Sequence, residues 1–242
     1  MEYWNKFEVV DKKFKPLVLT NAQIQVLLTG KFGDGCFVTT SNSVFYSANG
    51  IYQEYIDYKA SLLGDLLGKK HVLINSGYKE GTIYRLYTHA DPRVALICDE
   101  TIEESFDRMD ELGLALWVYD DGSLHKDKEF YQINTQKYPK EILEEVFIPK
   151  LKSKFGITAK STIERRRDGR EFWYLRISKY EGSNIISDAL SKYPLSCYQY
   201  KMWKPETVQK WNILRREAEQ AGLNLDTLNN RILGAMFRRI IV

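Results

Sequence analysis

Two apolar segments of this chain end abruptly in an Asp-Gly pair, and each is followed by residues typical of a β-strand. The segments cover residues 27–35 and 114–122. Each is an apolar helical run in which glycine marks the stop. The two acids that close the runs, Asp34 and Asp121, lie one small domain apart in the sequence.

The hydrophobic pattern around the first run predicts one half of a repeated structure. The expected elements are a helix over 22–32, paired strands over 36–47 with a turn at 41–43, a helix over 52–67 ended by Gly68, a hairpin of 71–78 and 82–88, and a helix over 92–104.

The second half repeats this order of helix, strands, helix, hairpin and helix. The expected elements are a helix over 111–119, a strand over 130–135, a helix over 139–155 that Pro149 should kink or divide, a hairpin of 157–166 and 170–178, and a helix over 182–192. We therefore expect a lead (1–20), two pseudo-equivalent halves (21–108 and 109–204), and a tail (205–242) with two helix-like segments and no assigned chemistry.

Composition is typical of a globular protein. The 242 residues are 44% hydrophobic, which is enough for a core, and no apolar run is long enough for a membrane span. The first residues do not resemble a signal peptide. The three cysteines are scattered without a CxxC pair, which favours a reducing compartment. We expect an intracellular site, such as the cytoplasm of a bacterium or phage-infected cell, or an organelle matrix.

The distribution of charge along the chain says more about possible partners than the net charge does. The formal net charge is only +3, but acidic residues gather in 99–111 and basic residues in 150–160 and 164–170. Segregated charges can make one face positive, as a nucleic-acid partner requires. An ordinary solvated charged surface explains the same pattern equally well.

The two terminal acids carry the candidate chemistry. If the two apolar helices pack side by side, Asp34 and Asp121 emerge together at one end, and two like charges so placed need a shared cation. Carboxylate oxygens favour Mg²⁺, which keeps several waters and also binds substrate phosphate. The carbonyls of Gly33 and Asp120 are further candidate ligands. The alternative is that both acids are simple turn residues.

These segments resemble the motifs of the single-chain LAGLIDADG homing endonucleases. The first matches in Leu27 and residues 33–35, and residues 115–124 resemble the tryptophan-containing, double-Asp form of the motif. Residues 133–136, 151–156 and 198–202 are also similar to family segments, so the resemblance covers about 20–204. The chain departs from the family in having Thr29 where Gly is usual.

The resemblance implies an α+β fold of two pseudo-symmetric halves. Each half would hold an antiparallel sheet of a DNA-binding saddle, and the halves would pack through the two motif helices. Asp34 and Asp121 would bind metal, and Lys201 would be the basic residue near the scissile phosphates. Gln136 would order water, and Arg93 is a weaker candidate for the basic residue of the first half.

The implied activity is site-specific cleavage of both DNA strands, leaving short 3′ overhangs. The resemblance implies two or three Mg²⁺ ions, which Mn²⁺ or Ca²⁺ can replace in binding, and a monomer on a long asymmetric duplex. It implies no organic cofactor and no membrane partner. Two alternatives stay open, namely an RNA maturase that assists splicing of a group I intron and a DNA-binding protein that does not cleave.

Strand alternation predicts which side chains would face DNA, since a two-stranded ribbon fits the major groove. In the second half Trp173, Leu175 and Ile177 should face the core. The expected DNA-facing residues there are Gln132, Asn134, Lys160, Thr162, Glu164, Arg166, Arg170, Tyr174, Arg176 and Ser178. The first half gives Thr39, Ser41, Ser47, Asn75, Lys79 and Arg85.

Overall fold

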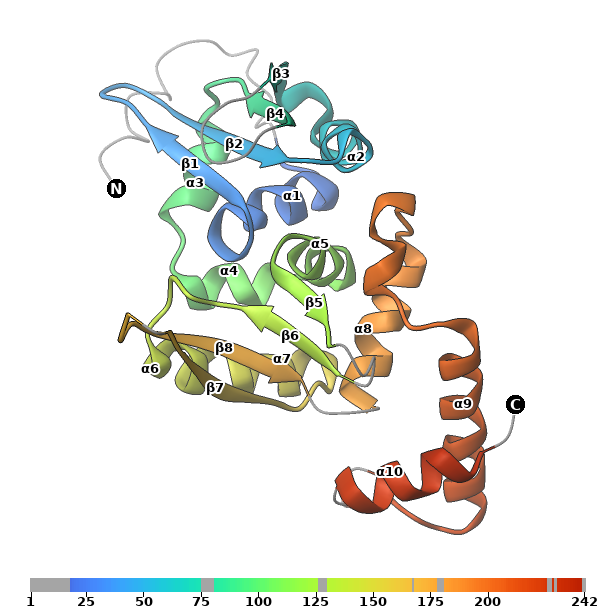
Figure 1. The fold of residues 1–242 in the computed structure, drawn as a ribbon. Coiled ribbons are helices and arrows are strands. Elements are labelled where there is room, and N and C mark those ends of the chain that lie inside the picture. The colour runs from blue at the N-terminus through green and yellow to red at the C-terminus, as the bar shows by residue number, and fades with distance from the viewer. Residues whose placement is uncertain are drawn as a thin grey trace.

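The protein is built from two sheets that flank a central pair of helices (Figure 1). The structure is a computed structural model that describes residues 18–74, 81–125, 130–166, 168–177, 181–225, 228 and 230–240. The first half contains α1 (Asn21–Phe32), β1 (Gly35–Thr39), β2 (Val44–Gly50), α2 (Gln53–Leu63), the short turn η2 (Gly64–Leu66), β3 (Leu67–Ile74), β4 (Thr82–Thr88), α3 (Pro92–Asp99) and α4 (Ile102–Arg108).

The second half follows the same order. It contains α5 (Glu111–Asp121), β5 (Gly122–Leu124), β6 (Tyr131–Asn134), α6 (Lys140–Ile142), the π-helical turn η3 (Leu143–Phe147), α7 (Ile148–Phe155), β7 (Ala159–Arg165), β8 (Glu171–Ile177), α8 (Glu181–Lys192) and the 3₁₀ turn η4 (Ser196–Lys201). The chain continues into α9 (Pro205–Gln220) and α10 (Asn230–Arg239).

The two sheets have the same topology. Their strand orders are β1-β2-β4-β3 and β5-β6-β8-β7, and all of their strand pairs are antiparallel. The expected α+β fold of two halves, each with an antiparallel sheet, is therefore confirmed.

Two of the expected helices differ from those in the structure. α2 ends at Gly64, which adopts a positive φ of 52° that favours glycine. Gly68 instead lies inside β3, where the pairing with β4 shifts register. The helix expected over 92–104 is two helices, because Thr101 caps a new one by accepting from the backbone N–H of Glu104.

Pro149 divides its helix as expected. Proline lacks the N–H that would bond to the preceding turn. The turn directly before α7 is accordingly π-helical (η3) rather than α-helical. The division therefore leaves the overall direction of the segment continuous in Figure 1.

The core sits around the helix pair α1 and α5. One side is closed by the rings of Phe32, Phe106, Trp117 and Phe147, whose centroids lie 5.5–6.0 Å apart. The other side is closed by a tyrosine cluster of Tyr52, Tyr55, Tyr119 and Tyr198. Both clusters join residues of the two halves, so the halves share one core.

The tail is anchored to this core. Trp211 and Leu214 of α9 are fully buried within it, and α10 packs against α9 beyond the second half (Figure 1). Within the described residues, none of the helices combines the length and the hydropathy that crossing a bilayer requires.

Candidate active site

Polar contacts at both ends of the helix pair align α1 with α5. Near the start of both helices, Asn21 donates to Asp110, with 2.5 Å between Nδ2 and Oδ2. Gln25 donates to the Arg108 carbonyl at 2.9 Å and accepts from the backbone N–H of Asp110 at 3.1 Å. The helices therefore start together and run in the same direction, which brings Asp34 and Asp121 to the same end.

The close approach at that end depends on Gly33. A Cβ at position 33 would lie 2.1 Å from Oδ2 of Asp120, so the carboxylate occupies the space that any side chain would need. Thr29, one turn earlier, fits without opening the interface because its hydroxyl is bonded to the Val26 carbonyl (2.8 Å) and to the Tyr46 hydroxyl (2.5 Å).

We predict that Gly33→Ala destabilises the fold by about 1–3 kcal/mol, the usual cost of overpacking a tight interface. The new methyl group must displace the Asp120 carboxylate, which has no free space around it. Urea unfolding measures this effect. Gly50→Ala is the comparison, because a Cβ there comes no nearer than 3.3 Å to any atom, and that atom is the flexible end of the Ile56 side chain. A Gly33→Ala protein as stable as the wild type would contradict the close approach.

Asp120 is held in a buried network. Its Oδ1 and Oδ2 both lie 2.9 Å from the Nζ of Lys59, and its Oδ1 accepts from the hydroxyl of Tyr55 at 2.6 Å. Its Oδ2 also accepts from the backbone N–H of Asp34 at 3.1 Å. The Lys59 and Asp120 side chains are 0% and 1% exposed. Burial is the largest single effect and lowers the pKa of Lys59, but the charges of Asp120, Tyr46 and Asp34 and the hydrogen bond to Asp120 together outweigh it, so the pKa is raised.

Both terminal acids have raised pKa values, and the charge of Asp34 acts on Asp121. Burial raises the pKa of Asp121 to about 7, with further contributions from the charges of Asp34 and Asp120. Burial also raises the pKa of Asp34, together with the charge of Asp120, against the opposing charges of Lys59, Lys201 and Lys137. Both carboxylates are thus placed where a negative charge is unfavourable unless a cation joins them.

Two lysines bond to the ends of the motif helices. The Nζ of Lys201 donates to the carbonyls of Val118 (3.1 Å) and Tyr119 (2.6 Å), and the Nζ of Lys137 donates to the carbonyl of Gly33 (3.2 Å). A cation at a helix C-terminus is favourable because the last carbonyls are unpaired. Burial lowers the pKa of Lys201 to about 8 and also lowers that of Lys137.

Two predicted residues lie differently from what we expected. Arg93 forms ion pairs with Asp65 (2.7 Å) and Asp91 (2.9 Å), so its guanidinium is already engaged within the first half. The first-half cation beside the acids is Lys59. Gln136 is exposed in the turn after β6, and it is its neighbour, Lys137, that reaches the site.

The oxygen atoms at this site fit a divalent ion that takes its remaining ligands from water and substrate. Within the described part of the chain, no group of three or more His, Cys, Asp and Glu side chains could hold a metal alone. Asp34 and Asp121 can each offer one carboxylate, whereas the Asp120 carboxylate is already bonded to Lys59. The Gly33 carbonyl accepts from Lys137 and keeps one lone pair. Mg²⁺ suits such a site, because it commonly takes one or two carboxylates plus waters and substrate phosphate.

We predict that Mg²⁺ raises the melting temperature more at pH 8 than at pH 5. The raised pKa of Asp121 stabilises the metal-free fold below its ordinary value near 4, and this stability is lost as pH rises through about 7. Mg²⁺ binds the deprotonated acids, so it stabilises the fold mainly above pH 7. For a chain of this size, each kcal/mol of metal-binding free energy should raise the melting temperature by about 2–4 °C. Differential scanning fluorimetry with Asp121→Asn as control tests this, and equal shifts at both pH values would contradict it.

The second sheet presents one polar face that helices do not cover. The register pairs Gln132 and Lys160 with Arg176, and Asn134 and Thr162 with Tyr174, so these residues share a face. Glu164, Arg166 and Arg170 continue it toward the hairpin end. Leu175 and Ile177, of the opposite parity, are buried as expected, Trp173 is half-buried, and Ile133 on the neighbouring strand is buried as well. Ser178 lies outside the described residues.

The open face of the first sheet differs from the expected one. Thr39 pairs with Val44 and shares its parity with the buried Tyr46, so it lies on the helix-covered face. Ser41 is in the β1–β2 turn, and Ser47 has the right parity but is only 4% exposed. Arg85 is on the open face, whose polar side chains are Asn49, Lys69, His71, Arg85 and Tyr87. Asn75 and Lys79 lie outside the described residues.

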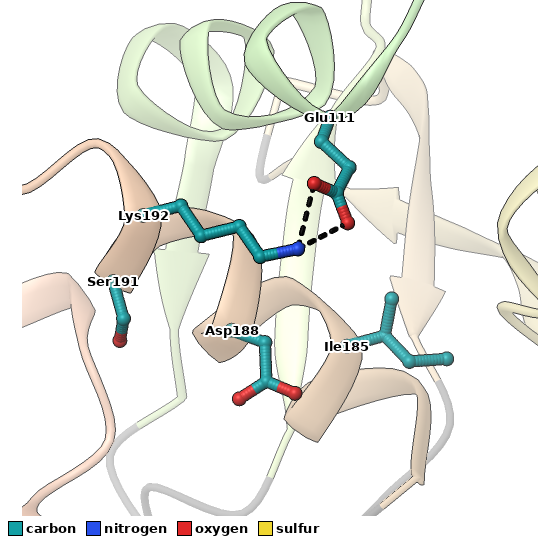
Figure 2. A pocket seen from close by; sticks show the side chains of 5 residues that line it. All are labelled: Glu111, Ile185, Asp188, Ser191 and Lys192. Carbon is teal, nitrogen blue, oxygen red and sulfur yellow. Dashed lines mark hydrogen bonds and ion pairs between the residues drawn. The ribbon is translucent and has the colours of Figure 1, made fainter.

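A surface pocket lies at the other end of α5 from the acids (Figure 2). It is lined by Glu111, Ile185, Asp188, Ser191 and Lys192, and an ion pair of 2.7 Å joins Lys192 to Glu111. Glu111 is the first residue of α5 and Asp121 is the last, so about 15 Å of helix separates the pocket from the acids.

Comparison with known proteins assigns the chain to a family. The model of the LAGLIDADG DNA endonuclease family matches residues 27–185, which is more than half of the sequence. The chain therefore belongs to the LAGLIDADG DNA endonuclease family, and this membership supports a DNA endonuclease function. No curated protein matches the chain.

Solved structures show the same fold. The homing endonuclease I-WcaI bound to its DNA recognition sequence aligns with a TM-score of 0.64 and 15% identity, covering 77% of this chain and 88% of that chain. Mesophilic variants of the homing endonuclease I-DmoI align with a TM-score of 0.48 and 18% identity, covering 71% of this chain and 97% of theirs. The fold assignment rests on the first of these.

Proposed function

We propose that this protein is a site-specific endonuclease that cuts both strands of a DNA duplex with a divalent metal, and that the metal is Mg²⁺. The observation that carries the proposal is the position of Asp34 at the end of α5, where its backbone N–H donates to Asp120, the residue directly before Asp121, and where its charge contributes to the raised pKa of Asp121. The relative I-WcaI, which was solved with its DNA recognition sequence, supports DNA as the partner.

The two open sheet faces provide the surface for recognition. Arginine side chains prefer guanine edges, and asparagine and glutamine prefer adenine. Arg176, Gln132 and Asn134 lie on paired strands of one sheet, and Arg85 and Asn49 lie on paired strands of the other. Because both halves contribute such a face, we propose a monomer that binds a long asymmetric site.

Cleavage requires that water attack phosphorus in line with the leaving 3′ oxygen. The new P–O bond forms as the bond from phosphorus to the 3′ oxygen breaks; the attacking water releases a proton to the solvent, and the leaving oxygen takes one from it. Mg²⁺ when bound would activate the water and stabilise the leaving oxygen. The chain's own contribution is to hold the ion through Asp34 and Asp121 and to place the positive charge of Lys201 nearby. With one acid for each strand, short 3′ overhangs are expected.

We predict that Lys201→Met slows cleavage by about 10²–10³-fold, the usual effect of removing one preorganised charge from a developing anion. Duplex affinity should change little, since Lys201 is only 5% exposed. Cleavage rates and a filter-binding assay measure the two effects. Lys204→Met, a nearby exposed lysine, is the matched control. Unchanged cleavage by a folded Lys201→Met protein would leave Lys201 with a purely structural role at the end of α5.

The proposed function is tested with a randomised duplex library and Mg²⁺. Discrete cuts in selected duplexes, with short 3′ overhangs, are the expected result. Tight binding without cuts would indicate a DNA-binding protein that does not cleave. Selective retention of structured intron RNA without DNA cleavage would indicate a maturase. Either of the last two outcomes contradicts the nuclease.

A further inference from the structure

We propose that the carboxylate of Asp120 positions the metal-binding acid of the opposite half, Asp34, by accepting a hydrogen bond from its backbone amide. This inference rests on the proposed nuclease function for its consequence in catalysis. It assigns the carboxylate of Asp120 a role other than metal ligation, although Asp120 directly precedes the other metal-binding acid, Asp121, in the sequence.

The first argument is that the Asp120 carboxylate is already fully engaged. Lys59 bonds to both of its oxygens at 2.9 Å, Tyr55 bonds to Oδ1 at 2.6 Å, and the Asp34 amide bonds to Oδ2 at 3.1 Å. A metal would have to displace Lys59, whose side chain is fully buried and whose charge would then lack a partner.

The second argument is the different position of the two acids relative to their helices. Asp121 is the last residue of α5, so the helix itself fixes its backbone. Asp34 lies two residues beyond the end of α1, and its amide donates to Asp120 instead. The first motif therefore needs an acceptor from outside its own helix to hold its acid in place.

The third argument is that the two halves are complementary at this point rather than alike. The residue that precedes Asp34 is Gly33, whereas the residue that precedes Asp121 is Asp120, and the Asp120 carboxylate fills the space above Gly33. Helix α2 of the first half, through Tyr55 and Lys59, holds that carboxylate in place. Asp120 thus belongs to the second half, but its carboxylate is bonded to Tyr55 and Lys59 of the first half. The residue that it positions, Asp34, also belongs to the first half.

Two double variants separate positioning from charge. Lys59→Met with Asp120→Asn and Lys59→Met with Asp120→Leu both remove the ion pair, so neither leaves a buried charge without a partner. Asn and Leu are similar in size, but only Asn keeps an oxygen that can accept from the Asp34 amide. A difference between the two variants therefore reports on the acceptor and not on the charges.

The functional readout is the rate of cleavage of each strand, measured on a selected duplex labelled separately on its two strands. Asp34→Asn and Asp121→Asn identify the strand that depends on each acid. The Leu variant should slow the Asp34-dependent strand by about 10- to 100-fold, as loss of a residue that orients a metal ligand usually does. The Asp121-dependent strand and the duplex affinity should be the same in the Leu and Asn variants, which share the Lys59→Met change, so the Asn variant is the reference for the loss.

Three outcomes of this assay would overturn the inference. The Leu variant could cut both strands at the wild-type ratio. It could also slow the Asp121-dependent strand, which would mean that Asp120 acts on its neighbour in the sequence, Asp121, rather than on Asp34. Alternatively, Asp34→Asn could slow both strands equally, which would remove the link between one acid and one strand.

A second readout does not depend on cleavage. Hydrogen exchange of the ¹⁵N-labelled Asp34 amide should lose its protection in the Leu variant and keep it in the Asn variant. Equal protection in both variants would overturn the inference even if the strand rates differed. A wild-type protein that cuts no DNA would refute the proposed function, while the exchange measurement would still decide whether Asp120 positions Asp34.

Discussion

Replacing Asp121 with Asn is expected to abolish double-strand cleavage and to leave only a nick in the strand that depends on Asp34, while duplex binding survives. Asn preserves the shape of the side chain but removes the negative charge that would hold a divalent ion. The rate of double-strand cleavage should fall by at least about 10²–10³-fold, the scale of losing one electrostatic contribution to the transition state. Asp34→Asn should have an effect of similar size for the same reason.

The measurement is a cleavage assay on a selected duplex, with binding followed by gel shift in Ca²⁺. Asp107→Asn is a suitable control, because Asp107 is an exposed acid paired with Lys150 away from the helix ends. If Asp121→Asn lost binding and cleavage to the same extent, Asp121 would be a structural residue and the proposed site would be wrong.

The largest expected effect on stability comes from Lys59→Met. This change leaves the Asp120 carboxylate buried without its partner, which typically costs about 3–5 kcal/mol. For a chain of this size the melting temperature should fall by roughly 6–20 °C. Thermal unfolding monitored by circular dichroism measures the loss.

Two controls make this prediction specific. Lys70→Met removes the exposed pair with Asp57 and should cost less than about 1 kcal/mol. Adding Asp120→Asn to Lys59→Met should recover most of the lost stability, because no unpaired charge then remains. A Lys59→Met protein that melts within a degree or two of the wild type would show that the pair contributes little to holding the halves together.

Much of the second half could be predicted from the sequence. Its strands alternate clearly, with Leu175 and Ile177 on the buried side and Tyr174 and Arg176 on the open side, and the hairpin turn is marked by Asp168 and Gly169. Strong alternation and a clear turn fix the register of a hairpin together.

The first half was predicted less well because its β3 strand carries an irregularity. Pairing shifts between Leu67 and Lys69, so Gly68 is part of a strand rather than the end of a helix. Thr39 was assigned to the wrong face because the β1 strand offers few apolar residues to fix its parity. In both cases the pairing with a neighbouring strand decides the structure, and the pattern of apolar residues along one segment does not reveal that pairing.

The acids of the site and Lys201 could be predicted from the sequence, but Lys59 and Lys137 could not. Lys59 does give a signal in the sequence, since it lies on the apolar stripe of α2 beside Tyr55 and Ala60, where a lysine needs a buried partner. Lys137 gives no such signal, because it is one polar residue in a turn. It reaches Gly33 only through the packing of the two halves.

A crystal structure of the protein with a selected duplex and Mn²⁺ tests the central claim most directly. Anomalous scattering locates the metal independently of any assumed ligand. Peaks bounded by the carboxylates of Asp34 and Asp121 and by DNA phosphate oxygens are the predicted result. Peaks at other residues, or carboxylates that point into separate surroundings with no metal between them, would contradict the account.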